Sequence, residues 1–559
     1  MRKAKNNLLS RLFASLNKEV YNYQESQNPD SGKKQLSRRN FISQSAKASA
    51  AITIGLSLPG LLSSCRETGT DQKDSSNKLL DVAILGGGMA GLNCANHLLN
   101  SGLNFKVFEG SERFGGRILT HYNDAMQLGI FPEFGGDFVD SDHEDMISLA
   151  KEFKLDLLDL IEEQEENHWI KDIFFFDNRS ISEKEIIKEF NKIAPKIAKD
   201  VASLGEDYDT EAAIKLDNTP LSDYIKSLDC AQWLKDLFVA AFVAEYGLDC
   251  EEQSTINMLD MIETDTKDGF YVFGTSDERF RIKGGNSKVI EGLVDKIGKE
   301  KIATNFAVKD VEELKDGTYS IHFENEDPIF AKTIVCTIPF TILRNLNLNL
   351  ANMAPEKRKC IAELGYGNNT KIILGYDGLP WRSKENNAMG YLFTNDMTNG
   401  WDASVNKTEN NPNGAYVAYF GGDYSQKLCD QSFKNPMAPP SHVWRTELPK
   451  ERVNGFVDEL DKIFKHSKEK FQGKHVFVNW IEYPWVKGSY SCYKVGQWST
   501  ISGWEMEPVG NFFFAGEHCS EMFQGFMNGA AETGRRVAIS VVNALKEKEM
   551  KTAKSENFN

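Results

Sequence analysis

The sequence predicts an α/β fold that begins with a parallel βαβ unit, and three features near residue 80 predict it. Residues 82–85 form a short apolar run suited to a buried parallel strand. Residues 92–99 follow as an amphipathic stretch with helical character. Residues 105–108 have the character of a second strand, which ends at the acidic Glu109. A strand, a helix and a second strand in this order are typical of a Rossmann-like unit.

Three glycines between the first strand and the helix indicate what this unit binds. Gly86, Gly88 and Gly91 have G-x-G-x-x-G spacing. The first permits a tight turn, the second lets backbone approach a pyrophosphate, and the third allows close helix–strand packing. The helix N-terminus offers free N–H groups to the phosphates, and Glu109, about 20 positions on, can accept hydrogen bonds from ribose hydroxyls. The predicted dinucleotide site comprises Gly86, Gly88, Met89, Ala90, Gly91 and Glu109.

A second glycine pair follows Glu109. With Arg113, Gly115, Gly116 and Arg117, the segment reads E-x-x-x-R-x-G-G-R. A glycine pair and a fixed cation just beyond the ribose acid suit a larger ligand, whose pyrophosphate and ribityl chain continue past the first βαβ unit. This segment resembles the FAD-binding N-terminus of the flavin amine oxidases, which include monoamine, polyamine and L-amino-acid oxidases.

Five later motifs resemble the same family and follow in the same order. They are residues 133–138 (EFGGDF), 281–286 (RIKGGN), 335–339 (VCTIP), 514–518 (FAGEH) and 525–534 (GFMNGAAETG). The resemblance covers residues 79 to about 545 and implies that FAD is the cofactor. The further FAD-binding residues that it implies are Gly115, Gly116, Arg117, Gly135, Gly136, Val308, Gly516, Glu517, Phe526 and Met527.

The resemblance implies a Rossmann-like FAD-binding domain of the GR2 type, interleaved with an α+β substrate-binding domain. We assign residues 79–149, 281–344 and 475–545 to the FAD-binding domain, residues 150–280 and 345–474 to the substrate-binding domain, and residues 546–559 to a polar tail. In the substrate-binding domain, residues 185–200 and 233–246 have helical character, residues 371–376 and 416–420 have strand character, and residues 447–470 predict a charged surface helix. We expect the substrate between the two insertions, where the domains meet.

Three residues are candidates for the chemistry. Lys371 lies in a strand-like run with apolar neighbours, and the resemblance implies a lysine there that bonds through water to flavin N5 and promotes the reaction with oxygen. Tyr490 and Phe526 align with the two aromatic residues that flank the flavin in monoamine oxidases. Further candidates for the substrate pocket are Asp137, Trp480, Trp485, Glu245 and His518.

The chain departs from the family pattern at two positions. Monoamine oxidases bind FAD covalently through a Cys just before the first of these aromatic residues, where this chain has Ser489; Cys492 lies after Tyr490. We therefore expect noncovalent FAD. Amino-acid oxidases hold the substrate carboxylate with an Arg soon after the second glycine pair, where this chain has Asp137 and no Arg through residue 142. This favours a simple amine or a polyamine as substrate.

The function implied by the resemblance is FAD-dependent oxidation of an amine. A hydride would pass from the amine α-carbon to flavin N5, and O2 would reoxidise the flavin and yield H2O2. Three alternatives stay open: an L-amino-acid oxidase, an FAD-dependent dehydrogenase or desaturase, and a flavin-binding lipoprotein without enzymatic activity. The expected partners are a small-molecule amine and O2. The sequence leaves the particular amine, the physiological electron acceptor and the oligomeric state open.

The composition of the chain bears on nucleic-acid binding, on metal binding and on the size of the core. The formal net charge of −16 argues against a nucleic-acid-binding protein, which needs a basic surface. The nine Cys include no C-x-x-C pair, so we predict no metal site. Aromatic residues at 11% are ample for a large core and an apolar pocket.

The N-terminal 65 residues predict an export signal. Residues 37–42 (SRRNFI) resemble a twin-arginine signal, and residues 48–62 are mildly apolar but too short and interrupted for a transmembrane helix. Residues 62–65 (LSSC) resemble a lipobox, in which Cys65 would be lipidated, and residues 66–78 resemble a polar linker. We expect a periplasmic or cell-surface protein that is anchored by lipid at Cys65. A chance Arg pair and a plain cleavage site are the alternatives.

Overall fold

The computed structural model describes residues 79–395, 397–436, 438 and 442–556. The predicted export signal, Cys65 and the linker at residues 66–78 lie outside the described residues. Within the described part of the chain, no helix combines the length and the apolar character needed to cross a membrane.

An eight-stranded sheet carries the βαβ unit that the sequence predicts. Strand β1 (Leu80–Leu85) pairs in parallel with β2 (Phe105–Phe108) and with β10 (Ile329–Cys336). The strand order is β11-β8-β9-β10-β1-β2-β7, and β19 also pairs with β10. β1 is paired on both edges, and its alternate residues pack into hydrophobic clusters on the two faces of the sheet, so the residues from Val82 onward are fully buried, which explains the apolar run. The other strands are β7 (Ile302–Ala303), β8 (Val308–Glu313), β9 (Tyr319–Phe323), β11 (Asn347–Asn349) and β19 (Phe512–Phe514).

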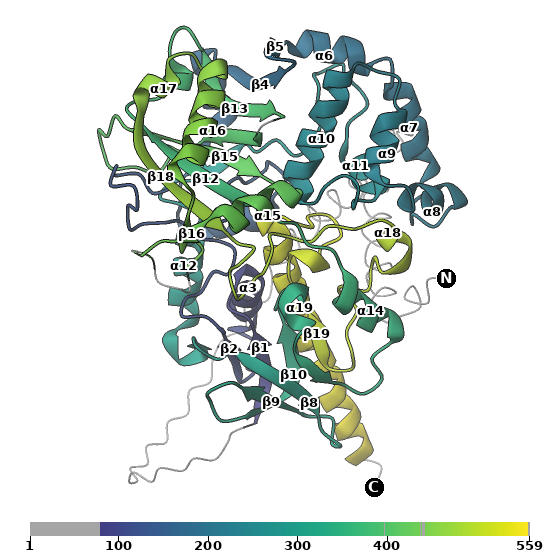
Figure 1. Ribbon diagram of the computed structural model, residues 1–559. Helices are drawn as coiled ribbons and strands as arrows, with labels where there is room; N and C mark the ends of the chain where they lie inside the picture. The colour runs from purple at the N-terminus through teal and green to yellow at the C-terminus, as the bar shows by residue number, and fades with distance from the viewer. Residues whose placement is uncertain (1–78, 396, 437, 439–441, 557–559) are drawn as a thin grey trace, which may run out of the picture. The chain divides into compact units, whose positions relative to one another are not determined.

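Three helices pack together beside this sheet. Helix α3 (Met89–Leu98) connects β1 to β2 and packs against α12 (Ser287–Ile297) and α19 (Met527–Glu556). The lower half of Figure 1 shows α3 and α19 next to β1 and β10. The start of α3, the start of α19 and the ends of β1 and β2 come from distant parts of the sequence. They meet at the end of the sheet where the predicted glycine loop lies.

A second large sheet, of seven strands, is separate from the eight-stranded sheet. Its order is β18-β12-β15-β14-β13-β4-β5, and helix α10 (Gln232–Tyr246) packs against β4, β13, β14 and β15. In Figure 1 the sheet lies at the upper left, with α10 beside it. The strands are β4 (Ile170–Phe176), β5 (Arg179–Ile181), β12 (Thr370–Tyr376), β13 (Ala388–Thr394), β14 (Thr398–Asp402), β15 (Gly414–Phe420) and β18 (Phe471–Asn479).

The remaining elements connect or cover the two large sheets. Two two-stranded sheets pair β3 (Leu157–Asp159) with β6 (Phe280–Ile282) and β16 (Phe433–Lys434) with β17 (Thr446–Glu447). The other α-helices are α4 (Glu144–Glu152), α5 (Leu160–Asn167), α6 (Glu183–Phe190), α7 (Ala194–Ser203), α8 (Glu211–Asp217), α9 (Leu221–Ser227), α11 (Thr255–Met261), α13 (Phe340–Leu343), α14 (Pro355–Glu363), α15 (Gly422–Gln431), α16 (Lys450–Ile463), α17 (Ser467–Lys470) and α18 (Gln497–Thr500). The 3₁₀ helices are η2 (Lys299–Lys301), η3 (Pro380–Arg382) and η4 (Glu517–Cys519).

The structure divides two segments that the sequence treats as single helices. Residues 185–200 contribute to α6 and α7, and Pro195 lies in the first turn of α7, where its missing N–H costs no hydrogen bond. Residues 447–470 contain α16 and α17, and His466 adopts a left-handed conformation between them (φ 66°). Pro195 is a sequence signal for the first break, whereas residues 464–466 (FKH) at the second break contain neither Pro nor Gly.

At two places, a strand pairs with a sheet of the other domain than the one to which we assign it from the sequence. β18 begins at Phe471 and pairs along its length with β12, so residues 475–479 belong to the seven-stranded sheet. β11 pairs with β8, so residues 347–349 belong to the eight-stranded sheet. A strand's partner is chosen by long-range pairing, which an apolar pattern along one segment does not encode.

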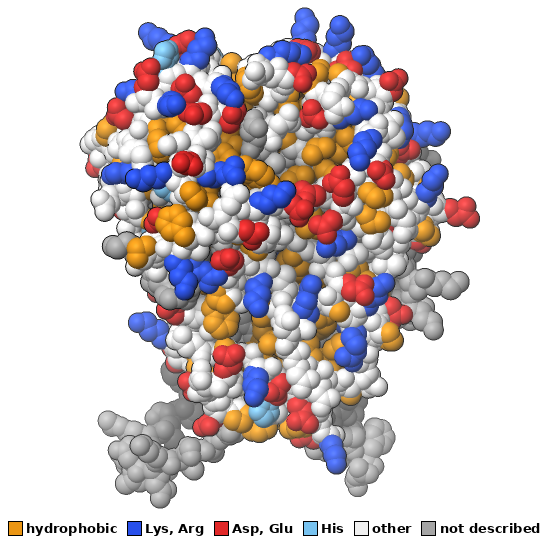
Figure 2. Space-filling model, viewed as in Figure 1, with side chains coloured by type: hydrophobic (Ala, Val, Ile, Leu, Met, Phe, Trp, Pro, Cys, Tyr) orange, Lys and Arg blue, Asp and Glu red, His pale blue; other side chains and the backbone are white. Residues whose placement is uncertain are grey.

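Acidic and basic side chains are interspersed on the face of the protein that Figure 2 shows. Hydrophobic side chains lie between them, singly and in small groups. This mixture is typical of a surface in contact with water.

Candidate active site

A cavity extends from the glycine loop of the eight-stranded sheet to aromatic residues of the seven-stranded sheet. Its volume available to the centres of water molecules is about 330 Å³. At one end it is lined by Gly86, Gly88 and Glu109, and at the other by Tyr391 and Trp401. A cavity that extends from the βαβ unit to a second sheet suits a ligand that continues well past the βαβ unit.

The three glycines of the loop have distinct environments. Gly86 has φ +111°, and a Cβ atom there would lie 2.4 Å from Thr337 Oγ1. A Cβ on Gly91 would lie 2.0 Å from the Gly86 carbonyl oxygen, so only glycine permits this helix–strand contact. A Cβ on Gly88 would meet no atom nearer than 3.9 Å. The space in front of Gly88 and the α3 N-terminus is therefore open to a pyrophosphate, and this cradle fits FAD.

Glu109 is held at the tip of β2. Its Oε2 accepts the N–H of Gly87 at 2.7 Å, and its Oε1 accepts the N–H of Ser111 at 2.8 Å. The carboxylate is buried and lines the cavity beside the glycine loop, where ribose hydroxyls could donate to it. Arg113 has a structural part here, because its guanidinium donates to the carbonyl groups of Phe114, Gly116 and Ile118.

Arg117 and Glu517 join three segments of the chain at the cavity. Arg117 Nη1 lies 2.7 Å from Glu517 Oε1 and donates to the Ser489 carbonyl oxygen at 2.7 Å. Glu517 also accepts the N–H and O–H of Ser491 and the N–H of Gly525. Burial alone would raise the pKa of Glu517, but the Arg117 guanidinium and these hydrogen bonds hold that pKa below its usual value.

Lys371 lies at the centre of the site on β12. It is 5% exposed, and its Nζ donates to the Gly135 carbonyl oxygen at 2.6 Å and to that of Glu133 at 3.4 Å. Its Nζ also lies 4.0 Å from Asp137 Oδ2. Burial lowers the pKa of Lys371, although Asp137 and Glu133 oppose this. Burial, with Asp137, raises the pKa of Glu133 to about 8. The ammonium is thus fixed against the second glycine pair.

Asp137 lines the cavity but is already engaged. Its Oδ1 lies 3.2 Å from Arg281 Nε, and its Oδ2 accepts the indole N–H of Trp401 at 2.7 Å. Together with the contact to Lys371, these partners make Asp137 a residue that positions its neighbours at the cavity wall.

The two predicted flanking aromatic residues both line the cavity. The Tyr490 hydroxyl lies 3.0 Å from the Ala244 carbonyl oxygen, to which it donates, and 3.1 Å from the Tyr419 hydroxyl. Phe526 packs edge-on against His143, with ring centroids 5.2 Å apart. Hydrogen bonds therefore hold the hydroxyl end of Tyr490, and the ring of His143 supports the ring of Phe526.

The other predicted site residues are distributed along the cavity. Trp480 lines it and donates its indole N–H to the Phe134 carbonyl oxygen. Trp485 lies against Gly110, next to Glu109, which places it at the nucleotide end and not at the substrate end. His518 is buried, packs on Phe340 and does not line the cavity. The remaining predicted residues that line the cavity are Met89, Ala90, Gly115, Gly116, Gly135, Gly136, Glu245, Val308, Gly516 and Met527.

Several cavity residues carry no motif that sequence reasoning could find. Tyr419 is paired with Lys371 across β15 and β12, and Asn399 is paired with Tyr419 across β14. Directly paired residues point to the same face of a sheet, so Lys371, Tyr419 and Asn399 reach the cavity together. Glu278 lies on the loop before β6, and Tyr391 on β13. These residues can be recognised as cavity residues only once the strand register and the loop positions are known.

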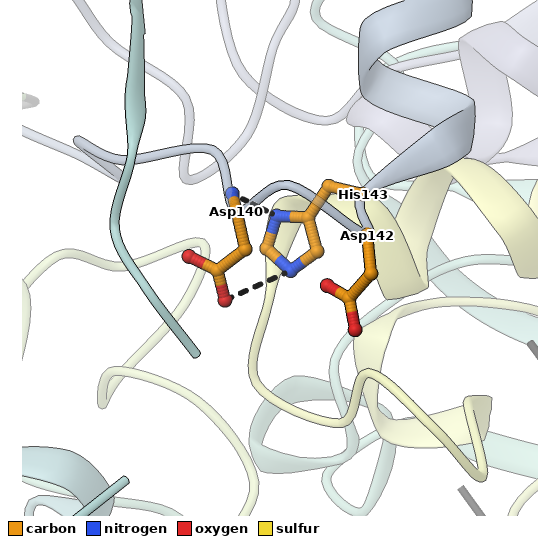
Figure 3. Close-up of side chains that lie close together, drawn as sticks. All are labelled: Asp140, Asp142 and His143. Atoms are coloured by element: carbon orange, nitrogen blue, oxygen red, sulfur yellow. Dashed lines mark hydrogen bonds and ion pairs between the residues drawn. The ribbon is translucent and has the colours of Figure 1, made fainter. Parts of the chain in front are cut away.

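Asp140, Asp142 and His143 form a small cluster near Phe526, shown in Figure 3. His143 Nδ1 accepts the N–H of Asp140 at 3.0 Å, and its Nε2 lies 3.5 Å from Asp140 Oδ2. Asp140 also accepts hydrogen bonds from Ser276 Oγ and the N–H of Glu278. Both ring nitrogens of His143 face partners within the protein, so the ring has no lone pair directed at a metal ion. The cluster instead holds the start of α4.

A glycine loop at a helix N-terminus, an acid at the tip of the second strand and a cavity reaching a second sheet define an FAD-dependent oxidoreductase. The model of the family described as flavin containing amine oxidoreductase matches residues 89–542. The chain therefore belongs to this family, and it binds FAD.

Known proteins resemble the chain over most of its length. Flavin-containing amine oxidase B of Homo sapiens is 24% identical over 494 residues, which are 84% of this chain and 87% of that protein. A flavin-containing amine oxidase of Danio rerio is also 24% identical, over 83% of this chain and 86% of its own length.

Two solved structures share the fold. Cyclohexylamine oxidase from Brevibacterium oxydans has a TM-score of 0.66 at 20% identity and covers 84% of this chain and 100% of its own. Wild-type putrescine oxidase bound to putrescine has a TM-score of 0.67 at 17% identity, over 83% of this chain and 99% of its own. At these identities the likeness concerns the fold.

Proposed function

We propose that the protein is an amine oxidase that converts a simple amine and O2 to the imine and H2O2. Water then releases the aldehyde and ammonia. When bound, FAD accepts a hydride equivalent from the amine α-carbon and returns the electrons to O2. The observation that carries this proposal is the substrate end of the cavity, which combines aromatic rings with carboxylates and lies beside the buried Lys371.

The chain's own residues supply orientation and electrostatics. Tyr490, held at its hydroxyl by Ala244 and Tyr419, presents a fixed ring to the cavity, which can orient an amine and exclude water. Lys371 adds a fixed nitrogen donor in a water-poor site, where a positive charge stabilises the negative charge that develops as oxygen accepts electrons.

The cavity disfavours an amino acid as substrate. Among the described residues, Arg117 and Lys371 are the cationic side chains that line it. Arg117 is paired with Glu517, and Lys371 lies against Gly135 and Asp137. A substrate carboxylate at the substrate end would instead meet Glu245 and Glu278, which also line the cavity. The dehydrogenase alternative differs in the electron acceptor, and a desaturase would also differ in the bond that is oxidised; reduction and reoxidation kinetics can distinguish them.

FAD is proposed to be bound without a covalent bond. Ser489 Oγ donates to Asn369 Oδ1 and offers no thiol. Cys492 is fully buried, lies beside Asn257 and does not line the cavity. No Cys or His side chain of the described residues lines the cavity. Acid precipitation should leave the flavin in the supernatant, and a yellow pellet that keeps its flavin would contradict this proposal.

The activity can be tested with the purified protein. Under anaerobic conditions, a panel of amines and L-amino acids is mixed with the enzyme while flavin absorbance is followed. Bleaching by amines but not by amino acids supports the proposal. Peroxide release after O2 is admitted identifies an oxidase, and slow reoxidation favours the dehydrogenase alternative. Absence of bleaching by every amine would refute the amine oxidase assignment.

We also propose export by the twin-arginine route and a lipid anchor at Cys65, on the strength of residues 37–42 and 62–65. A folded protein that takes up FAD before export suits that route. Replacing Arg38 and Arg39 by Lys should trap the precursor in the cytoplasm. Cys65→Ala should abolish labelling by a fatty-acid probe, and labelling that persists would rule out the lipid anchor at this residue.

A further inference from the structure

A row of aromatic rings connects Tyr490 to Glu278 along the cavity. The Tyr490 and Tyr419 hydroxyl groups lie 3.1 Å apart, and the rings of Tyr419 and Trp401 lie 5.2 Å apart. Trp401 stacks on Tyr391 with ring centroids 6.4 Å apart and planes inclined by 17°. The Tyr391 hydroxyl is hydrogen-bonded to the Glu278 carboxylate. All five residues line the same cavity, so an apolar wall leads from Tyr490 to a carboxylate.

The Glu278 carboxylate faces negative neighbours. Burial raises its pKa well above the usual value, and the charges of Asp140 and Glu245 raise it further. The hydrogen bond from Tyr391 and the charge of Lys171 lower the pKa, and burial and Asp140 outweigh them. Within the described residues, no Lys, Arg or His makes an ion pair with Glu278. Glu278 therefore has no cationic partner of its own and can take one from a ligand, whose positive charge would also favour the ionised carboxylate.

A second acceptor lies on the same wall. Asn399 is 3% exposed, lines the cavity and donates its Nδ2 to the Tyr391 hydroxyl at 2.9 Å. Its Oδ1 has no hydrogen-bond partner among the described residues. A buried acceptor without a partner costs free energy, and an ammonium group, with three donors and one positive charge, could satisfy such acceptors.

We propose that Glu278 binds a second ammonium group of the substrate, so that the enzyme prefers α,ω-diamines and polyamines to monoamines. This rests on the proposed amine oxidase function. The reacting amine lies toward Tyr490, the methylene chain lies along the rings of Tyr419, Trp401 and Tyr391, and the distal ammonium reaches Glu278.

An organic dication fits the cavity better than a metal ion. The aromatic faces favour a methylene chain and attract the cation at its end. A divalent metal would need several oxygen ligands around one point. The Asp140 carboxylate, whose charge acts on Glu278, already has Ser276, His143 and the N–H of Glu278 as partners.

The first test uses the wild-type holoenzyme. Anaerobic flavin reduction is measured with n-octylamine, 1,8-diaminooctane and mono-N-acetyl-1,8-diaminooctane, whose chain is long enough to follow the three rings; the acetylated form has a similar chain but lacks the second charge. We expect the rate constant divided by Kd to be about 100-fold higher for the diamine than for either comparison amine, since a buried charge pair is the difference. Equal values for the diamine and its acetylated form would overturn the proposal, and this test does not depend on any variant.

The second test uses two variants from the same loop. Glu278→Gln should lower the ratio of diamine to monoamine efficiency by about 100-fold, to near one. The control is Asp277→Asn: Asp277 binds Ser141 and does not line the large cavity, so this variant should keep the wild-type ratio. A Glu278→Gln variant with the wild-type ratio would overturn the proposal, as would equal loss in both variants, because that result indicates distortion of the loop.

Different outcomes test the role of Glu278 and the amine oxidase function. If monoamines reduce the flavin and diamines have no advantage, the role of Glu278 is wrong and the amine oxidase function stands. If no amine of either kind reduces the flavin, the proposed function is wrong and the role of Glu278 falls with it.

Discussion

Glu517→Gln is expected to weaken FAD binding, because Glu517 connects three segments that line the cavity. Its carboxylate pairs with Arg117 at 2.7 Å and accepts hydrogen bonds from Ser491 and Gly525. Gln keeps the size of the side chain but removes the charge. Its NH2 group also replaces one acceptor with a donor, which would face the donors of Arg117 or Ser491.

The magnitude follows from the ion-pair distance. At 2.7 Å and an effective dielectric constant of about 20, the Coulomb energy of the pair is about 6 kcal/mol. The Arg117 side chain is 25% exposed, so solvent screens part of this energy. We expect a net loss of about 3 kcal/mol, at the low end for breaking a buried pair. If the whole loss falls on FAD binding, the Kd of FAD rises about 100-fold.

The assay measures the FAD-to-protein ratio after gel filtration and the Kd by quenching of flavin fluorescence. If the loss falls on folding instead, the thermal midpoint drops by about 3 °C, because unfolding some 480 residues has an entropy of about 1 kcal/mol per degree. The control is Glu521→Gln, which changes an exposed carboxylate four residues away. Wild-type FAD affinity together with a wild-type midpoint in Glu517→Gln would refute the reasoning.

Three further variants test individual residues. Lys371→Met should slow flavin reoxidation by O2 about 100-fold, and more than flavin reduction, because it removes the buried ammonium beside the second glycine pair; stopped-flow absorbance separates the two half-reactions. Tyr490→Ala should slow reduction more than reoxidation, because the ring that orients the amine is lost. His518→Asn should flatten the loss of stability in acid. Burial lowers the pKa of His518 to about 4, so the unfolded chain takes up a proton first as pH falls below about 6.5. Stability is full above that pH and declines by about 3 kcal/mol toward pH 4, which denaturant unfolding across this range measures.

Each variant has a control of the same residue type on the surface: Lys309→Met, Tyr271→Ala and His466→Asn. Unchanged reoxidation in Lys371→Met would make Lys371 a structural residue or exclude O2 as the acceptor. A Tyr490→Ala variant that slows both half-reactions equally would contradict an orienting role. An acid profile in His518→Asn that matches the wild type would show that another group governs the acid loss.

The nucleotide end of the site could be predicted from the sequence because its geometry is local. The positive φ at Gly86 and the close contact of Gly91 with the Gly86 carbonyl arise within one βαβ unit, although Gly86 also lies against the distant Thr337. The second glycine pair and Arg117 follow directly in the same segment. Backbone geometry that only glycine permits leaves a readable spacing in the sequence.

The structure alone decided the shape and charge of the substrate end. Tyr419 and Asn399 reach the cavity because antiparallel pairing places them in one row with Lys371. Glu278 lies in an unremarkable loop, and its importance follows from Tyr391 and Asp140, which are more than 100 positions away. Trp485, which the sequence favoured as a pocket wall, instead lies beside Gly110 at the nucleotide end. Such contacts depend on strand register and loop packing, which arise when distant segments meet and leave no periodic pattern in either segment.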